Sequence, residues 1–210
     1  MDGVLLDSSS THERAYSSAF KKYQIEHDFR YAEFEGRSTS VVMQEIVESL
    51  KLDIGLVPDL IKAKQNFAQE YFLELIEPKI FPGVEEGLSE LANIYKMALC
   101  TSASQATMDF FFRGRVPKTI FDCLINSDMV SESKPNPHIY LKAMSVLGIG
   151  PNNCTVVEDS IAGVMAGLNS GAKVVHIGPI GKLENLSKLQ KQSVTNFSNF
   201  KNFSIFYLSE

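Results

Sequence analysis

Short apolar runs alternate with amphipathic segments after Phe81, and this alternation constrains the fold more than any other feature of the chain. We expect strands at residues 95–100, 121–126, 155–157 and 173–177, with helices at 84–91, 104–112, 135–147 and 160–170. Strands that alternate with helices are joined by right-handed crossovers. The pattern therefore predicts a parallel sheet with helices on both faces. Beyond residue 180 the pattern weakens, and we expect one more helix, a short strand and a frayed end.

The segment from about residue 11 to residue 77 has a different, helical texture. Apolar side chains recur at helical spacing within residues 15–23, 41–50 and 60–72. Nothing in this segment has the alternation that is typical of a strand. We therefore expect a small helical bundle ahead of the alternating strands and helices.

The composition excludes several classes of function. With 210 residues, the chain can form one domain or a core with a smaller insert. A net charge of −5 and the absence of a basic stripe argue against binding to nucleic acid or to an anionic membrane. No apolar run is long enough to span a bilayer, and the N-terminus lacks the basic start of a secretory signal. Three cysteines without CxxC spacing are typical of buried thiols in a reducing cytosol, so we expect a cytoplasmic protein. We also favour a monomer.

Polar residues occupy the ends of the expected strands. Thr101–Ser102 and Glu158–Asp159 each follow a strand, Lys134 lies in the loop after another, and Asp2 stands close to the start of the chain. Each has an ordinary explanation as a helix cap or a solvated loop lysine. Ligands of parallel sheets bind beyond the carboxyl ends of the strands, however, where these residues converge. Carboxylates suit Mg²⁺, and lysine and hydroxyl groups suit phosphate oxygens, so the set points to phosphoryl transfer.

These residues carry a resemblance to a known family. Met1–Ser8, Cys100–Ser102, Ser133–Pro137 and Val157–Gly163 resemble the four ordered motifs of the haloacid dehalogenase-like superfamily. The branch that the chain most resembles is the β-phosphoglucomutase-like phosphatases and phosphomutases, and Phe81–Val84 resembles their return from cap to core. The resemblance implies a Rossmann-like α/β core at residues 1–9 and 79–210 and an inserted helical cap at residues 10–78.

The resemblance also implies a function and a set of site residues. We expect a Mg²⁺-dependent phosphatase that acts on a small phosphorylated metabolite, such as a sugar phosphate, through an aspartyl-phosphate. The catalytic residues would be Asp2, Thr101 and Lys134; the Mg²⁺ ligands Asp159, Glu158 and Asp2; and the phosphate or substrate contacts Gly3, Ser102, His12, Arg37 and Lys64. In this scheme Asp2 exchanges a proton with the leaving or attacking oxygen. For His12, Arg37 and Lys64, the alternative is a solvated position on the surface of a helix.

The family's first motif is Asp-x-Asp-Gly, and Asp2 matches its second Asp. The first Asp, which attacks phosphorus, would stand one place before Met1. Its strand would lie between the strands that end at Thr101 and Asp159. Without that strand, buried backbone groups would stay unpaired at a cost of roughly 1–3 kcal/mol each. We therefore expect that Met1 is not the natural start of the working protein.

Three alternatives stay open at this point. A β-phosphoglucomutase-like mutase would need the cap to exclude water from the site. Ala103 lacks the polar group that some mutase-like members use there, which favours hydrolysis. A non-catalytic binding protein would account for a chain without the nucleophile. A phospho-receiver domain is disfavoured, because it has no place for the helical insert.

Overall fold

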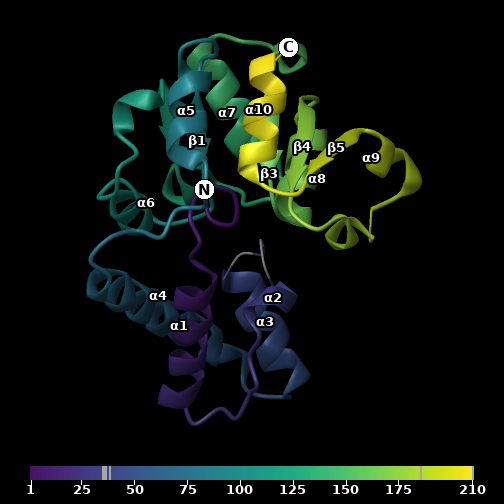
Figure 1. Cartoon of the computed structure of the whole chain (residues 1–210). Helices are drawn as coiled ribbons and strands as arrows, with labels where there is room; N and C mark the ends of the chain where they lie inside the picture. Colours follow the sequence, from purple (N-terminus) through teal and green to yellow (C-terminus); the bar gives the residue numbers. More distant parts are fainter. Residues whose placement is uncertain (35–36, 38, 185, 210) are drawn as a thin grey trace.

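The chain divides into a helical lobe and an α/β lobe in the computed structural model, which describes residues 1–34, 37, 39–184 and 186–209 (Figure 1). The helical lobe contains α1 (Ser9–Lys22), α2 (Tyr31–Phe34), α3 (Thr39–Ser49) and α4 (Val57–Glu74). Its interior is apolar and partly aromatic, and the Tyr16 and Phe29 rings stack at 4.3 Å between centroids. The expected helical bundle thus forms, and no strand interrupts it among the described residues.

The α/β lobe contains helices and strands in the expected alternation. Its helices are α5 (Val84–Ala92), α6 (Gln105–Phe111), α7 (His138–Leu147), α8 (Ile161–Asn169), α9 (Lys188–Gln192) and α10 (Phe200–Ser209). Its strands are β1 (Ala98–Cys100), β2 (Cys123–Ile125), β3 (Thr155–Glu158), β4 (Lys173–Ile177) and β5 (Val194–Phe197). All the strand pairs are parallel. No helix among the described residues is long and apolar enough to cross a membrane.

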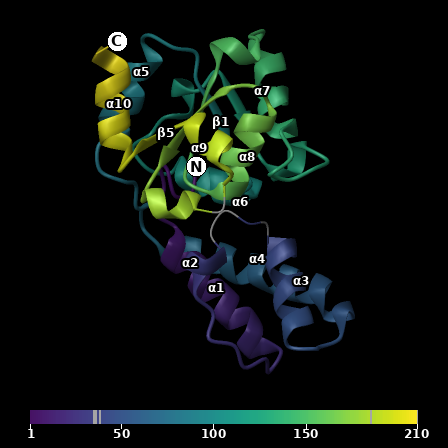
Figure 2. The ribbon, with the colours of Figure 1, turned by 90° about the vertical axis from the view of Figure 1, so that its right-hand side faces the viewer.

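Helices cover both faces of the strands. Side chains alternate across a strand, and Leu99 and Val175 pack on the side of α5 and α10, while Ile125, Val156 and Val174 pack on the side of α7 and α8. Helices α5 and α10 lie against each other on their face (Figures 1 and 2). The result is the three-layer α/β arrangement that the alternation predicts.

The strands are parallel, as predicted, and they form two sheets. β1 pairs with β2, and β3, β4 and β5 pair in that order, but β1 and β3 do not pair with each other in the described part of the chain. The amino group of Met1 acts electrostatically on both Cys100 and Glu158, so the first residue lies near the ends of β1 and β3. The described chain places no extended segment between these two strands, which is why they stay separate.

Two expectations need correction. Helix α7 begins at His138 rather than at residue 135, because Lys134 and Asn136 each precede a proline and are therefore disfavoured in helical conformation. The C-terminal region is more ordered than expected. It adds α9, the paired strand β5 and α10, whose Phe200 and Phe203 are buried in the core.

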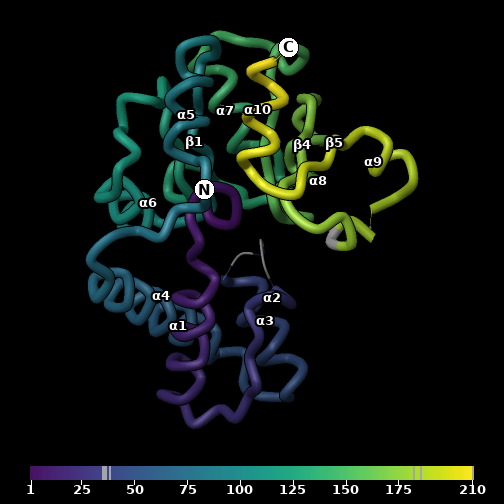
Figure 3. Tube along the Cα trace, viewed as in Figure 1, coloured from purple at the N-terminus to yellow at the C-terminus, as the bar shows by residue number. Residues whose placement is uncertain are grey.

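The two connections between the lobes run beside each other, as the trace shows (Figure 3). Asp7 N–H donates to Lys79 O at 2.8 Å, and Phe81 N–H donates to Leu5 O at 2.9 Å. The Lys79 ammonium also pairs with the Asp7 carboxylate at 2.6 Å. These contacts, which we call the paired linkers, join the lobes at one place.

Candidate active site

A cavity of about 880 Å³ lies where the helical lobe faces the carboxyl ends of the strands. Its lining includes all the residues that the sequence singled out: Asp2, Gly3, His12, Arg37, Lys64, Thr101, Ser102, Lys134, Glu158 and Asp159. Both lobes contribute, and the Phe72 and Phe110 rings pack across the lobe junction at 4.9 Å between centroids. Folding therefore brings the four motifs and the helical insert to one place.

Asp2 is held by groups from the start of the helical lobe. Ser8 Oγ donates to Asp2 Oδ1 at 2.5 Å, and His12 Nε2 lies 3.5 Å from the same oxygen. Burial raises the pKa of Asp2, but the hydrogen bonds from His12 and Ser8 and the positive charge nearby outweigh burial and leave this pKa below its ordinary value. Asp2 is therefore ionised near neutral pH in this arrangement.

His12 and Lys64 are buried rather than solvated. Lys64 Nζ lies 3.3 Å from His12 Nδ1 and 3.4 Å from Thr39 Oγ1, with the Tyr16 ring 4.9 Å away. An ammonium only donates, so His12 Nδ1 accepts and the ring proton sits on Nε2, which faces Asp2. Burial, followed by the charge of Lys64, lowers the pKa of His12. A neutral imidazole thus links the lysine to the carboxylate.

Replacing Lys64 by Met tests the cost of this buried ammonium. Burial lowers the pKa of Lys64 from 10.5 to about 8, so the unfolded chain binds more protons between these two values. The stability of the wild type should therefore rise with pH across that window, and in Lys64→Met this rise should disappear. At pH 7 the variant should be more stable by about 1–3 kcal/mol.

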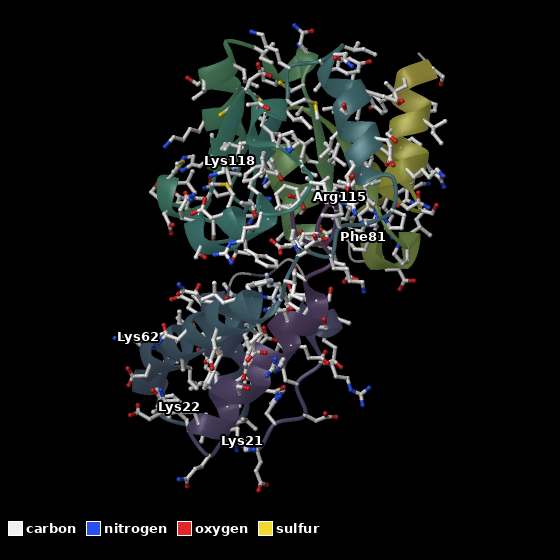
Figure 4. All side chains as sticks on the ribbon, turned by 60° about the vertical axis from the view of Figure 1, so that its left-hand side comes forward. Lys21, Lys22, Lys62, Phe81, Arg115 and Lys118 are labelled. Atoms are coloured by element: carbon white, nitrogen blue, oxygen red, sulfur yellow. The ribbon has the colours of Figure 1, made fainter. Side chains whose placement is uncertain are left out.

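Urea denaturation at pH 7 and pH 9.5 measures both effects. Lys62→Met is the matched control, because Lys62 is exposed on the outer side of α4 (Figure 4). A lower stability of Lys64→Met at pH 7, with an unchanged pH dependence, would show that the lysine is not penalised by burial.

Glu158 lies at the centre of a buried polar cluster. Lys134 Nζ and the Tyr140 hydroxyl both donate to Glu158 Oε1, and Ser160 Oγ donates to Oε2 at 3.2 Å. Burial raises the pKa of Glu158. The charge of Lys134 and the hydrogen bonds from Lys134 and Tyr140 lower this pKa by more than burial raises it, so the net shift is downward. Gly163 allows this packing, because a Cβ there would lie 2.0 Å from the Glu158 carboxylate.

Thr101 presents a hydroxyl to the cavity from the end of β1. Its side chain is buried, and Oγ1 accepts a hydrogen bond from Ala103 N–H at 3.1 Å. A hydroxyl that accepts in this way keeps its own proton for a ligand oxygen. Ser102 follows on the cavity wall and is exposed. Arg37 is also exposed, and its guanidinium pairs with Glu45 in the helical lobe.

Asp159 directs its carboxylate toward the N-terminal loop. Gly3 adopts φ +71°, and a Cβ at this position would lie 1.9 Å from Asp159 Oδ2. A side chain would therefore fill the space that the carboxylate occupies. The described residues contain no cluster of three His, Cys, Asp or Glu side chains that could enclose a metal.

The sequence argument missed Tyr140, Ser8, His176 and Asn196. Tyr140 binds Glu158 from α7, and its spacing of six residues after Lys134 is not distinctive by itself. His176 interrupts an otherwise aliphatic run in β4, which was the available signal, whereas Asn196 follows another polar residue in β5 and gave no signal. His176 is entirely buried, which only the folded structure reveals.

Comparisons with known proteins agree with this architecture. The family model of the haloacid dehalogenase-like hydrolases matches residues 1–177, and the chain belongs to this family. It is similar to a phosphorylated carbohydrates phosphatase of Thermotoga maritima, with 29% identity over 181 residues that cover 84% of this chain and 81% of that protein. It is also similar to a fructose-1-phosphate phosphatase of Escherichia coli K12, with 25% identity over 178 residues that cover 84% of this chain and 93% of that protein.

The fold comparison is equally extensive. The crystal structure of a β-phosphoglucomutase from Clostridium difficile superposes with a TM-score of 0.82 and 21% identity, covering 99% of this chain and 92% of that one. At this identity the comparison shows a shared fold. The family and the α/β fold class predicted from the sequence are thereby confirmed.

Proposed function

We propose that the protein is a Mg²⁺-dependent phosphatase of small phosphorylated metabolites, with sugar phosphates as the favoured class. The observation that carries the proposal is the single cavity that gathers Asp2, Thr101, Lys134 and Asp159 with His12 and Lys64 of the helical lobe. The names of the two relatives above, both phosphatases of phosphorylated sugars, support this substrate class. The proposal includes the division into a core at residues 1–9 and 79–210 and a cap at residues 10–78, and a monomeric cytoplasmic protein.

The proposed reaction is a two-step transfer. In the scheme that the resemblance implies, a carboxylate one position ahead of Met1 attacks phosphorus, and the bond to the metabolite oxygen breaks. Asp2, ionised in the free protein, takes the proton of the bound phosphate monoanion and passes it to that oxygen. Water then attacks the aspartyl-phosphate, gives its proton to Asp2 and releases phosphate. Lys134 and Thr101 bind the phosphoryl oxygens, with Gly3 and Ser102 beside them.

The carboxylates present fit Mg²⁺. This ion prefers oxygen ligands and often takes one or two carboxylates, several waters and a substrate phosphate rather than a full protein cage. Asp159 and Asp2 would hold it. Glu158, whose oxygens already accept from Lys134, Tyr140 and Ser160, would support Asp159 rather than enclose the ion. When bound, Mg²⁺ supplies charge neutralisation for the phosphoryl group.

Contacts to the rest of the substrate are assigned to the helical lobe. His12 and Lys64 reach the cavity from α1 and α4, and Arg37 lines it from the segment ahead of α3. The buried Lys64 ammonium and the Arg37 guanidinium suit an anionic metabolite. This part of the proposal concerns substrate selection, whereas the core residues concern phosphoryl transfer.

An N-terminal extension tests the proposal directly. An apolar strand that ends in Asp immediately before Met1 should produce phosphate release from sugar phosphates in the presence of Mg²⁺. The same extension with Asn at that position should abolish turnover while the extended chain still folds. EDTA should also abolish the activity.

The outcomes separate the candidate functions. Isomerisation of the sugar phosphate without phosphate release would identify a mutase. Binding of Mg²⁺ and phosphate by all variants, without turnover by any, would identify a binding protein. Equal turnover by the Asp and Asn extensions would contradict the proposed nucleophile.

A further inference from the structure

His176 occupies an unusual position for an imidazole. It lies in the middle of the β3–β4–β5 sheet with no exposed surface. Its register partners are Glu158 in β3 and Asn196 in β5. The other residues of β4 that are buried are aliphatic, so an aliphatic residue would also suit the burial at this place. Burying a polar side chain costs free energy unless its hydrogen bonds are made, so both ring nitrogens of His176 are expected to have hydrogen-bond partners.

Both ring nitrogens of His176 have partners. Nε2 lies 3.2 Å from the backbone oxygen of Asp159, and Nδ1 lies 2.6 Å from the atom placed as Oδ1 in the Asn196 amide. The backbone carbonyl of Asp159 only accepts, so Nε2 carries the proton toward it, and the Asn196 amide then presents its NH₂ group rather than Oδ1 to the unprotonated Nδ1. The Asn196 amide fixes the orientation of the ring from the other side. His176 is thus oriented by β5 and donates to the loop after β3.

This hydrogen bond acts on the residue whose carboxylate faces the cavity. The Asp159 carbonyl is bound from the sheet side, and its carboxylate lies against Gly3 on the cavity side. On either side of Asp159, Glu158 is bound by Lys134, and Ser160 caps α8 by accepting from Gly163 N–H at 3.1 Å. The hydrogen bond from His176 adds a restraint on the Asp159 backbone between these two fixed neighbours.

We propose that His176 is a positioning residue that, through the Asp159 carbonyl, sets the direction of the Asp159 carboxylate toward Mg²⁺. This inference rests on the proposed function, because it takes Asp159 as the metal ligand. Groups that orient metal ligands without touching the metal typically affect affinity by about 10–100-fold. Asn196 acts one step further out, by holding the ring.

Two conservative variants separate positioning from simple packing. In His176→Gln the amide nitrogen extends to about the place of Nε2 and keeps a donor for Asp159. In His176→Asn the shorter amide keeps a partner for Asn196 but leaves the Asp159 carbonyl without its donor. Both variants replace the ring by an amide and lose ring packing, so a purely structural role would affect them in the same direction.

Calorimetric titration with MgCl₂ measures the effect. We expect the Mg²⁺ dissociation constant to rise about tenfold in His176→Asn and to stay within about threefold of wild type in His176→Gln. Asn196→Ala, which leaves the imidazole in place, should lie between them. Equal Mg²⁺ affinity of the Asn and Gln variants would overturn the positioning role.

A metal-free measurement keeps this inference distinct from the proposed function. Amide hydrogen exchange across residues 158–163 should be faster in His176→Asn than in wild type, and unchanged in His176→Gln. If the wild type binds no Mg²⁺ but this exchange pattern is found, the metal assignment fails while the anchoring of Asp159 stands. If exchange is the same in both variants, the anchoring itself is contradicted.

Discussion

Replacing Lys134 by Ala should reduce the free energy of unfolding by about 3–5 kcal/mol, because it leaves the Glu158 carboxylate buried without its cationic partner. Both side chains are about nine-tenths buried, with 8% exposure each. For a chain of this length, such a loss corresponds to a decrease in melting temperature of roughly 6–20 °C. Thermal unfolding followed by circular dichroism measures it.

The pH dependence of the stability provides a second test of the Lys134→Ala prediction. The pKa of Glu158 is lowered in the folded wild type, so its stabilising contribution is complete above the ordinary value of 4.5 and is lost as the pH falls through the lower folded value. Without Lys134, burial raises the pKa instead. The variant should then lose stability as the pH rises from 4.5 through that raised value, a range in which the contribution of Glu158 to the wild type no longer changes.

Lys118→Ala is the matched control for Lys134→Ala. Lys118 Nζ pairs with Asp109 at 3.1 Å, but both side chains are about half exposed. Exposed pairs of this kind contribute about 0–1 kcal/mol. Equal destabilisation by the two substitutions would mean that burial of the Glu158 cluster has no energetic consequence.

Replacing Gly3 by Ala should weaken Mg²⁺ binding more than tenfold, as expected when the group that a metal ligand packs against is disturbed. A Cβ at this position would lie 1.9 Å from Asp159 Oδ2, so the carboxylate must move. The substitution also places a side chain at φ +71°, which costs about 1–2 kcal/mol. Calorimetric titration and thermal unfolding measure the two effects separately.

Gly148→Ala isolates the conformational contribution. Gly148 has a similar φ of +67°, but a Cβ there would meet nothing within 4 Å. This variant should show the loss of stability and retain normal Mg²⁺ binding. If Gly3→Ala also retains normal binding, the Asp159 carboxylate is not required where the structure places it.

The alternation of strands and helices could be predicted because each element has its own periodicity and end signals. The Thr101, Lys134 and Asp159 motifs could be located for the same reason, since they follow strand ends directly. The separation of the strands into two sheets could not be deduced from the periodicity, because pairing depends on which segments are adjacent in space. A helix and a short strand were expected in the C-terminal region and are present, but the burial of its aromatic residues in the core depends on packing against α5 and could not be deduced.

The finer arrangement of the candidate site depends on contacts between distant residues. Nothing in the spacing of His12 and Lys64, which are 52 residues apart, indicates that they share a buried hydrogen bond. A helical histidine or lysine is more often solvated, and only packing against Tyr16 and Phe72 distinguishes this pair. The same holds for Tyr140, whose hydroxyl donates to Glu158 from helix α7.

The paired linkers also bear on how such a chain can diversify. Because the α/β lobe itself holds Leu5 to Phe81 and Asp7 to Lys79, the ends of the helical insertion are already joined. The loop-closure entropy of an insertion with joined ends changes by only about 0.6 kcal/mol for each doubling of its length. A longer, shorter or unrelated module grafted between these points would leave the folding free energy of the α/β lobe nearly unchanged. Under the proposed function, substrate selection can therefore be exchanged by recombination at two adjacent backbone positions, provided that the new module keeps a partner for Asp2 in the place of His12.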